Sequence, residues 1–217
     1  MKNLKYLVIV LLVTFIYSNA NSQVSLYVAA EGGINIANAN ITPQPQVNVS
    51  SRTGLIIGGM LDIFFTPQIG ISTGMRYVMK GFEFPGTLNN GTAVQVTAKA
   101  NYLEFPVLFK VKFPLTEVKP YLLAGPTLGL NLTSNLDYVG GGQQGSEDNS
   151  ANTESIDFGL LFGAGSDFKV ANKVSLFVQF GYELGLSNVA KTQNQATTAS
   201  TTKTYGLQFT GGVRFSL

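Results

Sequence analysis

The sequence contains no cysteine and no histidine in 217 residues. Without cysteine the chain cannot form disulfides, thiolate zinc sites or iron–sulfur clusters, and it offers no cysteine for lipid attachment. Without histidine it cannot form a Ser-His-Asp triad or a histidine-ligated metal site. These absences exclude most hydrolase and metalloenzyme chemistries. We therefore expect no enzyme activity, no catalytic residue, no metal site and no cofactor.

Charged residues are also scarce, at 12% of the chain, against about a quarter in ordinary soluble domains. In contrast, glycine occurs 24 times and aromatic residues make up 11%. Disordered chains show high charge and few aromatic residues. The composition therefore predicts a folded chain.

The N-terminus has the pattern of a secretory signal peptide. Lys2 and Lys5 precede the apolar run Leu7–Tyr17, and small residues follow at Ser18–Ser22. The run is too short to cross about 30 Å of hydrocarbon as a helix. We expect residues 1–22 to be the signal, with cleavage after Ala20 or Ser22, and residues 23–217 to form one domain. Removing the signal leaves 12 basic and 12 acidic residues, so no nucleic-acid partner is expected.

The rest of the chain alternates apolar and polar residues, which is typical of strands with one apolar face. The alternation is clearest in the last segment, where Tyr205, Leu207 and Phe209 begin the apolar face. The expected strands are Val24–Asn38, Arg52–Phe65, Ile69–Phe84, Ala93–Phe113, Lys119–Thr133, Ser155–Val170, Val174–Leu186 and Thr204–Leu217.

The expected connections alternate between long and short. The short ones are Thr66–Gln68, Pro114–Val118 and Ala171–Lys173, and the long ones are Ala39–Ser51, Pro85–Thr92, Ser134–Glu154 and Ser187–Thr202. Short turns on one rim and long loops on the other are typical of outer-membrane barrels with an even number of strands. The sequence predicts an all-β fold: an eight-stranded antiparallel up-and-down transmembrane β-barrel.

Periodicity alone leaves open whether the apolar face points outward into lipid or inward, as in a soluble ligand-binding barrel. The expected strands carry more large apolar side chains on that face than the interior of an eight-stranded barrel can hold. The opposite face is mostly glycine, serine, threonine and a few charges, which does fit inside. We therefore expect outer-membrane lipid around the barrel and an outer-membrane location.

Ten charged residues are expected to face the lumen and to form a structural charge network, because an unpaired buried charge is costly. Lys80 and Lys110 are expected to pair there near Glu104. The ten are Glu31, Asp62, Arg76, Lys80, Glu104, Lys110, Asp157, Asp167, Glu183 and Arg214.

Aromatic residues and prolines add two smaller expectations. Aromatic residues near the strand ends are interpreted as girdles at the lipid interfaces. Pro106 and Pro126 fall inside expected strands and predict a bulge or local break, because proline cannot donate to a ladder. The proposed girdle residues are Phe64, Phe65, Phe113, Tyr121, Tyr182, Tyr205 and Phe215.

Several of these segments resemble a known family. Tyr102–Lys110 (YLEFPVLFK) is similar to a segment of the Bacteroidetes outer-membrane β-barrel proteins called PorT-like, and Tyr121–Gly129 (YLLAGPTLG) resembles the strand that follows it there. Asp157–Gly159 and Gly163–Gly165 also match. The resemblance covers essentially all of the chain after the signal and implies an OmpA/OmpX-like eight-stranded barrel. It also implies a secretion-system or envelope protein as a partner, because the family's namesake assists secretion.

Two motifs are set aside. Gly140–Gly145 satisfies the spacing G-x-G-x-x-G but lies outside a βαβ unit, so it is interpreted as a flexible loop. Asp137, Glu147, Asp148 and Asn149 match no EF-hand spacing and are interpreted as solvated loop residues.

Four functions remain open at this stage. The favoured one is a non-enzymatic outer-membrane barrel with exposed loops that acts as an accessory in secretion, adhesion or envelope integrity. The main alternative is a small passive porin-like channel. An outer-membrane enzyme and a soluble lipid-binding barrel are the other two.

Overall fold

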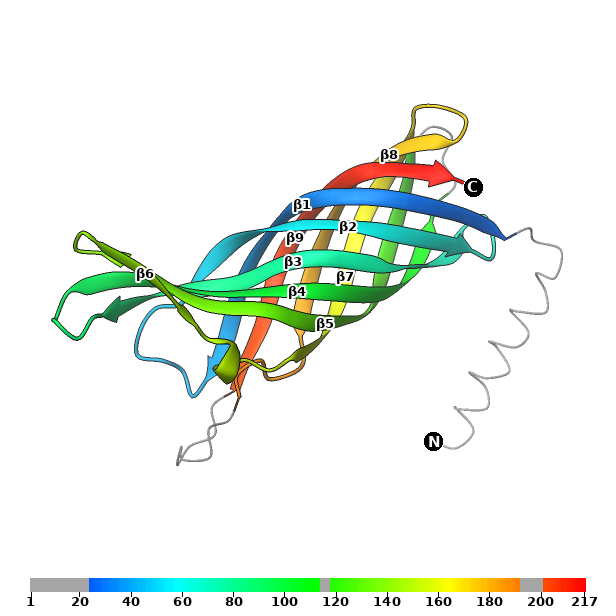
Figure 1. Ribbon diagram of the computed structural model, residues 1–217. Helices are drawn as coiled ribbons and strands as arrows, with labels where there is room; N and C mark the ends of the chain where they lie inside the picture. The colour runs from blue at the N-terminus through cyan, green and yellow to red at the C-terminus, as the bar shows by residue number, and fades with distance from the viewer. Residues whose placement is uncertain (1–23, 114–117, 192–200) are drawn as a thin grey trace, which may run out of the picture.

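The computed structural model describes residues 24–113, 118–191 and 201–217, and most of them lie in antiparallel strands (Figure 1). Among these residues, no helix is long and apolar enough to cross a membrane. The predicted signal peptide lies outside the described residues and stays a prediction. The elements are β1 (Ser25–Thr42), β2 (Ser50–Phe64), β3 (Ile69–Thr87), β4 (Ala93–Lys112), β5 (Val118–Gly140), β6 (Gln143–Asp148), the 3-10 helix η1 (Ser150–Asn152), β7 (Ile156–Lys169), β8 (Val174–Gly185) and β9 (Thr201–Ser216).

Eight of the strands close into a ring in the order β1-β2-β3-β4-β5-β7-β8-β9. The first and last strands close it, with β1 and β9 paired from Tyr27↔Ser216 to Thr42↔Thr201. All pairings between neighbouring strands are antiparallel. The predicted eight-stranded up-and-down barrel is confirmed.

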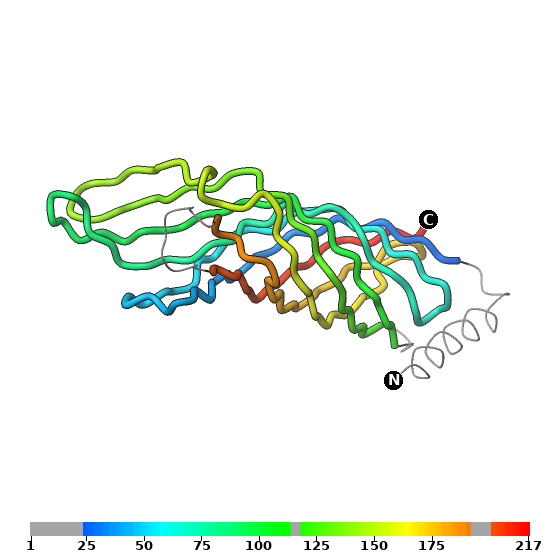
Figure 2. The backbone as a smooth tube through the Cα atoms, turned by 90° about the horizontal axis from the view of Figure 1, so that it is seen from below, coloured from blue at the N-terminus to red at the C-terminus, as the bar shows by residue number. Residues whose placement is uncertain are grey.

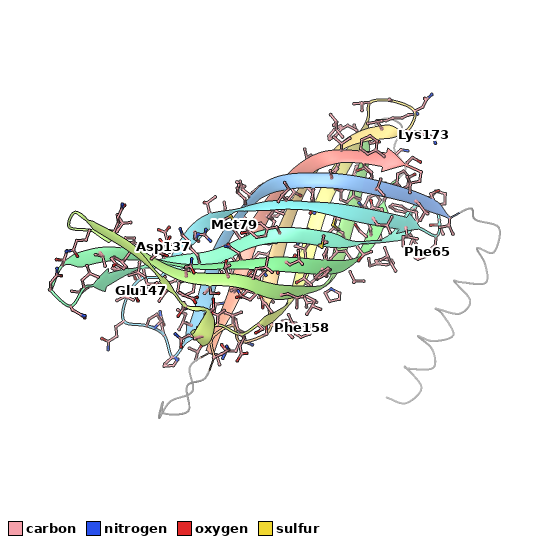
Figure 3. All side chains as sticks on the ribbon, viewed as in Figure 1. Phe65, Met79, Asp137, Glu147, Phe158 and Lys173 are labelled. Atoms are coloured by element: carbon pink, nitrogen blue, oxygen red, sulfur yellow. The ribbon has the colours of Figure 1, made fainter. Side chains whose placement is uncertain are left out.

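The alternation along each strand separates the two faces of the wall. On β4, Glu104 and Leu108 are at most 1% exposed, whereas Val107 is 50% exposed. Apolar side chains such as Phe158 lie on the outside (Figure 3), where they face lipid. The inner face is less polar than predicted, because large apolar side chains also point inward, among them Ile56, Met60, Val78, Leu108 and Leu161.

Three neighbouring strands, β3, β4 and β5, are the longest in the part of the chain that the structure describes. β3, β4 and β5 contain 19, 20 and 23 residues, whereas β7 and β8 contain 14 and 12. Their far ends, together with β6, project beyond the ring as a sheet at the end opposite the short turns (Figures 1 and 2). We call residues 82–99 and 134–148 the extension.

The expectation of a loop over Ser134–Glu154 is wrong. This stretch holds the end of β5, all of β6 and η1. The Gly140–Gly145 segment is likewise a tight hairpin and not a flexible loop: Gly140 pairs with Gln143, and Gly141 and Gly142 turn the chain with φ of 57° and 76°. Positive φ at both central positions is the geometry of a two-residue hairpin turn that favours glycine.

The prediction of a bulge or local break at Pro106 and Pro126 is confirmed as a local break of the ladder without a shift of register. The β3–β4 ladder passes from Thr73↔Val107 to Arg76↔Glu104 in the same register, a local break only. The Pro106 carbonyl accepts a hydrogen bond from the Thr73 hydroxyl at 2.8 Å. The register of β4 against β5 shifts instead at Asn101/Tyr102, close to where the extension begins.

Candidate functional site: the lumen and its outer mouth

The ten charged residues expected in the lumen all lie on the inner face of the wall, and each is at most 6% exposed. They fall into two layers along the barrel axis. The middle layer consists of Glu31, Arg76, Lys80, Glu104, Asp157 and Glu183. The turn-end layer contains Asp62, Lys110, Asp167 and Arg214, together with Lys112.

In the middle layer, Lys80 links opposite walls of the barrel. Its ammonium group on β3 lies 2.6 Å from a Glu183 carboxylate oxygen on β8 and 3.0 Å from an Asp157 oxygen on β7. The same ammonium lies 3.3 Å from Glu104 on the adjacent strand β4. Because β3 and β8 face each other across the ring, this side chain spans the lumen.

Arg76 supplies the second cation of the middle layer. Its guanidinium pairs with Glu104 and lies 3.7 Å from Glu31 on β1. It also donates to the Gln208 side-chain oxygen on β9 at 3.2 Å, and the Gln208 amide donates to Glu183 at 2.6 Å. Through Gln208 the two cations and their carboxylates form one connected set.

Hydroxyl groups complete the layer by donating to its carboxylates. The Ser187 hydroxyl donates to Asp157 at 2.8 Å, and the Thr204 hydroxyl donates to the same side chain at 3.3 Å. Thr127 donates to Glu183 at 3.2 Å. Donors from β5, β9 and the β8–β9 connection thus partly satisfy Asp157 and Glu183, two of the four carboxylates that share the two cations of this layer.

The turn-end layer contains a residue that the sequence-based set omits. Lys112 lies 2.8 Å from Asp167, which also pairs with Arg214. Asp62 accepts from Lys110 at 2.9 Å and lies 2.9 Å from the Arg214 guanidinium. Lys112 follows Lys110 at the strand period of two, and this spacing could have identified it.

Aromatic rings line the lumen beside these cations. The Lys110 ammonium lies 4.1 Å from the centre of the Tyr121 ring, and the Arg214 guanidinium lies 4.6 Å from that of Phe177. Lys112 lies 4.4 Å from the centre of Phe64. Such contacts stabilise a desolvated cation. The girdle interpretation is therefore wrong for Phe64 and Tyr121, which are 3% and 1% exposed and face inward.

The two layers close the middle of the barrel. Their side chains are buried and form ion pairs between strands. The pairs join β3 to β1, β7 and β8, join β4 to β2 and β7, and join β9 to β2. The apolar side chains of Leu108, Leu123 and Leu161 pack with Tyr121 between them as one buried cluster. An eight-stranded barrel has an interior that side chains can fill, and here they do.

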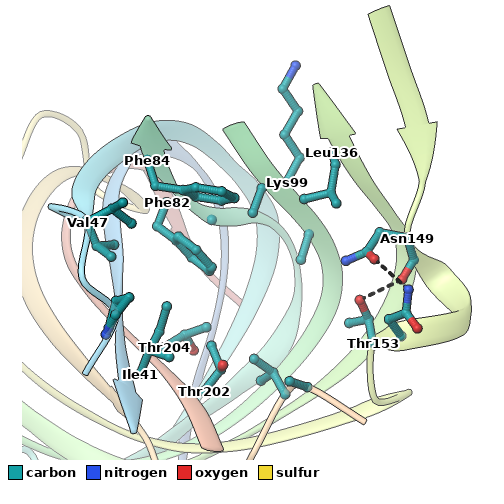
Figure 4. A pocket seen from close by; sticks show the side chains of 18 of the residues that line it. Ile41, Val47, Phe82, Phe84, Lys99, Leu136, Asn149, Thr153, Thr202 and Thr204 are labelled. Carbon is teal, nitrogen blue, oxygen red and sulfur yellow. Dashed lines mark hydrogen bonds between the residues drawn. The ribbon is translucent and has the colours of Figure 1, made fainter. Parts of the chain in front are cut away.

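Above the middle layer, at the end with the long connections, lies a cavity of about 320 Å³, the mouth cavity (Figure 4). Tyr102, Thr202 and Thr204 line it next to the charged layer. Its apolar walls come from the end of β1, the β1–β2 connection, β4, the extension and the β8–β9 connection. They consist of Ile41, Pro45, Val47, Val49, Phe82, Phe84, Ala98, Ala100, Leu136, Val189 and Ala190.

The inner face changes polarity where the barrel ends and the extension begins. On β3 the inward positions pass from Arg76 and Lys80 to Phe82 and Phe84, whose rings lie 5.9 Å apart. On β4 the inward positions pass from Glu104 in the barrel to Ala98 and Val96 in the extension. The outward positions of β4 change from apolar to polar, with Val107 in the barrel and Thr97 in the extension. The extension thus turns its apolar face toward the barrel axis.

Two acidic residues of the extension, Asp137 and Asp148, bind neighbours in the chain, and Figure 3 labels Asp137 on this part of the molecule. Asp137 pairs with Lys99 and accepts from the Ser146 hydroxyl, and hydrogen bonds from these two side chains hold the pKa of Asp137 below its usual value. Asp148 accepts from the backbone N–H of Ser150 at 2.9 Å. These contacts agree with a structural role for both side chains.

Comparison with known proteins identifies the family and the fold. The family described as outer membrane protein beta-barrel domain matches residues 17–191. No curated protein sequence matches the chain. The solved structure of outer membrane protein OprG from Pseudomonas aeruginosa is 12% identical, covers 90% of this chain and 97% of its own, and has a TM-score of 0.53. That likeness shows a shared fold.

Two other solved structures are similar over nearly their whole length. Neisserial surface protein A, from Neisseria, is 17% identical with a TM-score of 0.46 and covers 89% of this chain and 99% of its own. The attachment invasion locus protein Ail of Yersinia pestis is 12% identical with a TM-score of 0.37 and covers 87% of this chain and 98% of its own.

Proposed function

The chain belongs to the outer membrane protein beta-barrel domain family, and from that premise we propose that it is a non-enzymatic barrel that does not conduct solutes. In this proposal the mouth and the extension bind a partner at the cell surface, and the barrel holds them in the membrane. Outer-membrane barrels place their short turns in the periplasm and their longer loops outside the cell. The mouth cavity and the extension lie at the long-loop end.

One observation carries the proposal: charged side chains bridge opposite walls in the middle of the lumen. The contacts of Lys80 with Glu183 and Asp157 span the ring between the mouth and the turn end. A solute passing through would have to separate buried ion pairs, and breaking one such pair leaves an uncompensated charge, at a cost of about 3–5 kcal/mol. The long-loop end offers the mouth cavity and the extension as surface for a partner.

The surface role takes one of the forms that the sequence favours: an accessory in secretion, adhesion or envelope integrity. The PorT-like resemblance supports a secretion-system or envelope protein as the partner. Its motif residues Tyr102, Glu104 and Lys110 all face the lumen. The motif therefore supports a common barrel interior more directly than a common task.

Planar-bilayer recordings of the purified protein test the closed lumen. We expect no stable conductance from the native protein. A stable, reproducible conductance step would overturn the proposal and favour the porin-like channel. A Lys80→Ala, Glu183→Ala double variant is the matched comparison, because it removes a bridge across the lumen, and it is expected to show at least brief openings.

A shortened variant tests the surface role. Phe84 pairs with Val96, and Leu136 pairs with Glu147, so an Asn-Gly turn replacing residues 85–95 and another replacing 137–146 preserve both registers. In a strain lacking the gene, we expect the full chain, but not the shortened one, to restore normal secretion, adhesion and envelope permeability. Full rescue by a shortened chain that reaches the membrane would contradict a role for the extension.

A further inference from the structure

The mouth cavity has the size and lining of a small-molecule site. At about 320 Å³ it falls at the lower end of the range of ligand pockets, about 300–1,000 Å³, which are mostly apolar with a few polar groups. It is roughly twice the volume of an engineered apolar cavity that takes up benzene. We propose that this cavity binds one small, uncharged, apolar molecule of about two aromatic rings. The inference rests on the proposed surface-binding role and names a ligand for it.

Lipid contact does not account for the apolar lining. Phe82, Phe84 and Ala98 point toward the barrel axis, away from the outer face that meets lipid lower down. Val47, from the β1–β2 connection, also lines the cavity and remains 42% exposed. Apolar side chains that surround a space without filling it lose contacts that a bound apolar molecule would restore.

The charges around the cavity favour an uncharged ligand. Among the described residues that line the cavity, Lys99 is the one with a formal charge, and its ammonium pairs with Asp137. The lining hydroxyls of Thr153 and Thr204 donate to the Asn149 carbonyl at 3.0 Å and to Asp157 at 3.3 Å. A charged group in this cavity would be desolvated, and no described lining residue offers it an unpaired counter-ion.

Tyr102 contributes to the lining at the floor of the cavity, but its hydroxyl is buried beside the Asn131 side chain and does not face the ligand. Because the charged middle layer lies directly below, the molecule is held at the mouth and does not pass through the barrel.

The absence of tryptophan from the chain allows a direct binding test. Phe84→Trp places a single fluorescent reporter in the cavity wall, and Phe180→Trp places one on the lipid face, where Phe180 is 43% exposed. Each protein in dodecyl maltoside is titrated with 2-bromonaphthalene, an uncharged two-ring quencher. We expect saturable quenching of the Phe84→Trp reporter and only linear quenching, from partition into the micelle, of the Phe180→Trp reporter.

Filling the cavity provides the matched control. Ala98→Leu in the Phe84→Trp protein should weaken saturable quenching at least tenfold, and 2-naphthalenesulfonate should bind the unfilled protein at least tenfold more weakly than 2-bromonaphthalene. The heat-dependent gel shift shows whether each barrel is folded. If Ala98→Leu does not fold, Val49→Asp, in the β1–β2 connection, serves in its place with the same expected loss.

Linear quenching of the Phe84→Trp reporter, or saturable quenching that neither cavity variant weakens, would overturn the ligand site. Such a result would leave the closed barrel standing, because bilayer recordings on the same preparations test conductance separately. A stable conductance together with saturable quenching would instead overturn the non-conducting role and retain the site.

Discussion

Three strands, β3, β4 and β5, run through both the lower barrel, which lies between the middle layer and the short turns, and the extension, and their two faces have opposite polarity in the two regions. On β4, Val107 faces lipid while Glu104 faces the lumen, but further along Thr97 faces outward while Val96 faces the axis. Below, lipid surrounds the wall and the polar groups must pair inside. Above, water surrounds the sheet, so the apolar side chains gather on the inner face. The difference shows that the surrounding solvent decides which face of a continuous strand is apolar.

Breaking the middle layer should have the largest effect. Lys80→Met leaves Glu104, Asp157 and Glu183 buried without their shared cation, and we expect a loss of stability of about 3–5 kcal/mol. Urea unfolding in lipid vesicles, followed by the heat-dependent gel shift, measures it. Lys99→Met is the control from the extension: its ion pair with Asp137 is partly exposed, so the loss should stay below about 1 kcal/mol. Equal losses would contradict the contrast between the regions.

A charge placed on the outer face should destabilise the lower barrel but not the extension. The expected loss of stability is somewhat smaller than for Lys80→Met. Val107→Arg places a guanidinium toward lipid on the lower part of β4, with an expected loss of about 2–4 kcal/mol near the midplane. Thr97→Arg, at an equivalent outward position in the extension, should change stability by less than about 0.5 kcal/mol. The same vesicle unfolding assay compares the two. A similar cost for both would place the extension in the membrane.

A substitution in the turn of the β5–β6 hairpin should cause a smaller loss of stability, confined to the extension. Gly142→Val forces a side chain into a left-handed backbone position, where the expected cost is about 1–2 kcal/mol. Nothing lies within 4 Å of the added Cβ, so the cost comes from the backbone. Hydrogen exchange should show lost protection in β6 with an unchanged barrel, and Gln143→Val should leave both intact. Unfolding of the whole barrel would show that the regions are not independent.

The smallest predicted effect depends on pH. Because Lys99 and Ser146 lower the pKa of Asp137, the ionised carboxylate stabilises the folded hairpin above the unfolded-state pKa, and this contribution is lost as the pH falls through the lowered pKa. At this exposed site it should amount to about 0.2–1 kcal/mol. The free energy of opening of β6, measured by hydrogen exchange and corrected for intrinsic rates, should fall in acid for the native chain and change less for Asp137→Asn. An identical acid response in the native chain and in Asp137→Asn would show that the Asp137 carboxylate does not stabilise the hairpin.

The barrel wall could be predicted from the sequence because lipid imposes an apolar residue at every second position. The ends of β3 and β4 in the extension were predicted as strand up to Phe84 and from Ala93, but the end of β5 and all of β6 escaped prediction, because the outer apolar face fades where the strands leave the ring. Short alternations did remain, with Val94 and Val96 on β4 and Leu136 and Tyr138 on β5, and they mark the inner face of the extension.

The lumen could be predicted in its composition but not in its pairing. Position along the strand sufficed to place Lys80 and Glu183 on inner faces, but their contact depends on which strands lie opposite in the closed ring. The error over Phe64 and Tyr121 was avoidable, since each lies on the opposite side of its strand from the predicted apolar face. The mouth cavity depends on how the β1–β2 connection folds over the extension, which periodicity does not encode.

Accessibility measured along β4 tests the change of polarity most directly. The chain has no cysteine, so single-cysteine variants at Thr97 and Val107 can be labelled with a nitroxide without background. In lipid vesicles, we predict that the label at Val107 relaxes mainly with oxygen, which concentrates in lipid, and the label at Thr97 mainly with a water-soluble nickel complex. A label at Thr97 that responds to oxygen as the label at Val107 does would contradict the account.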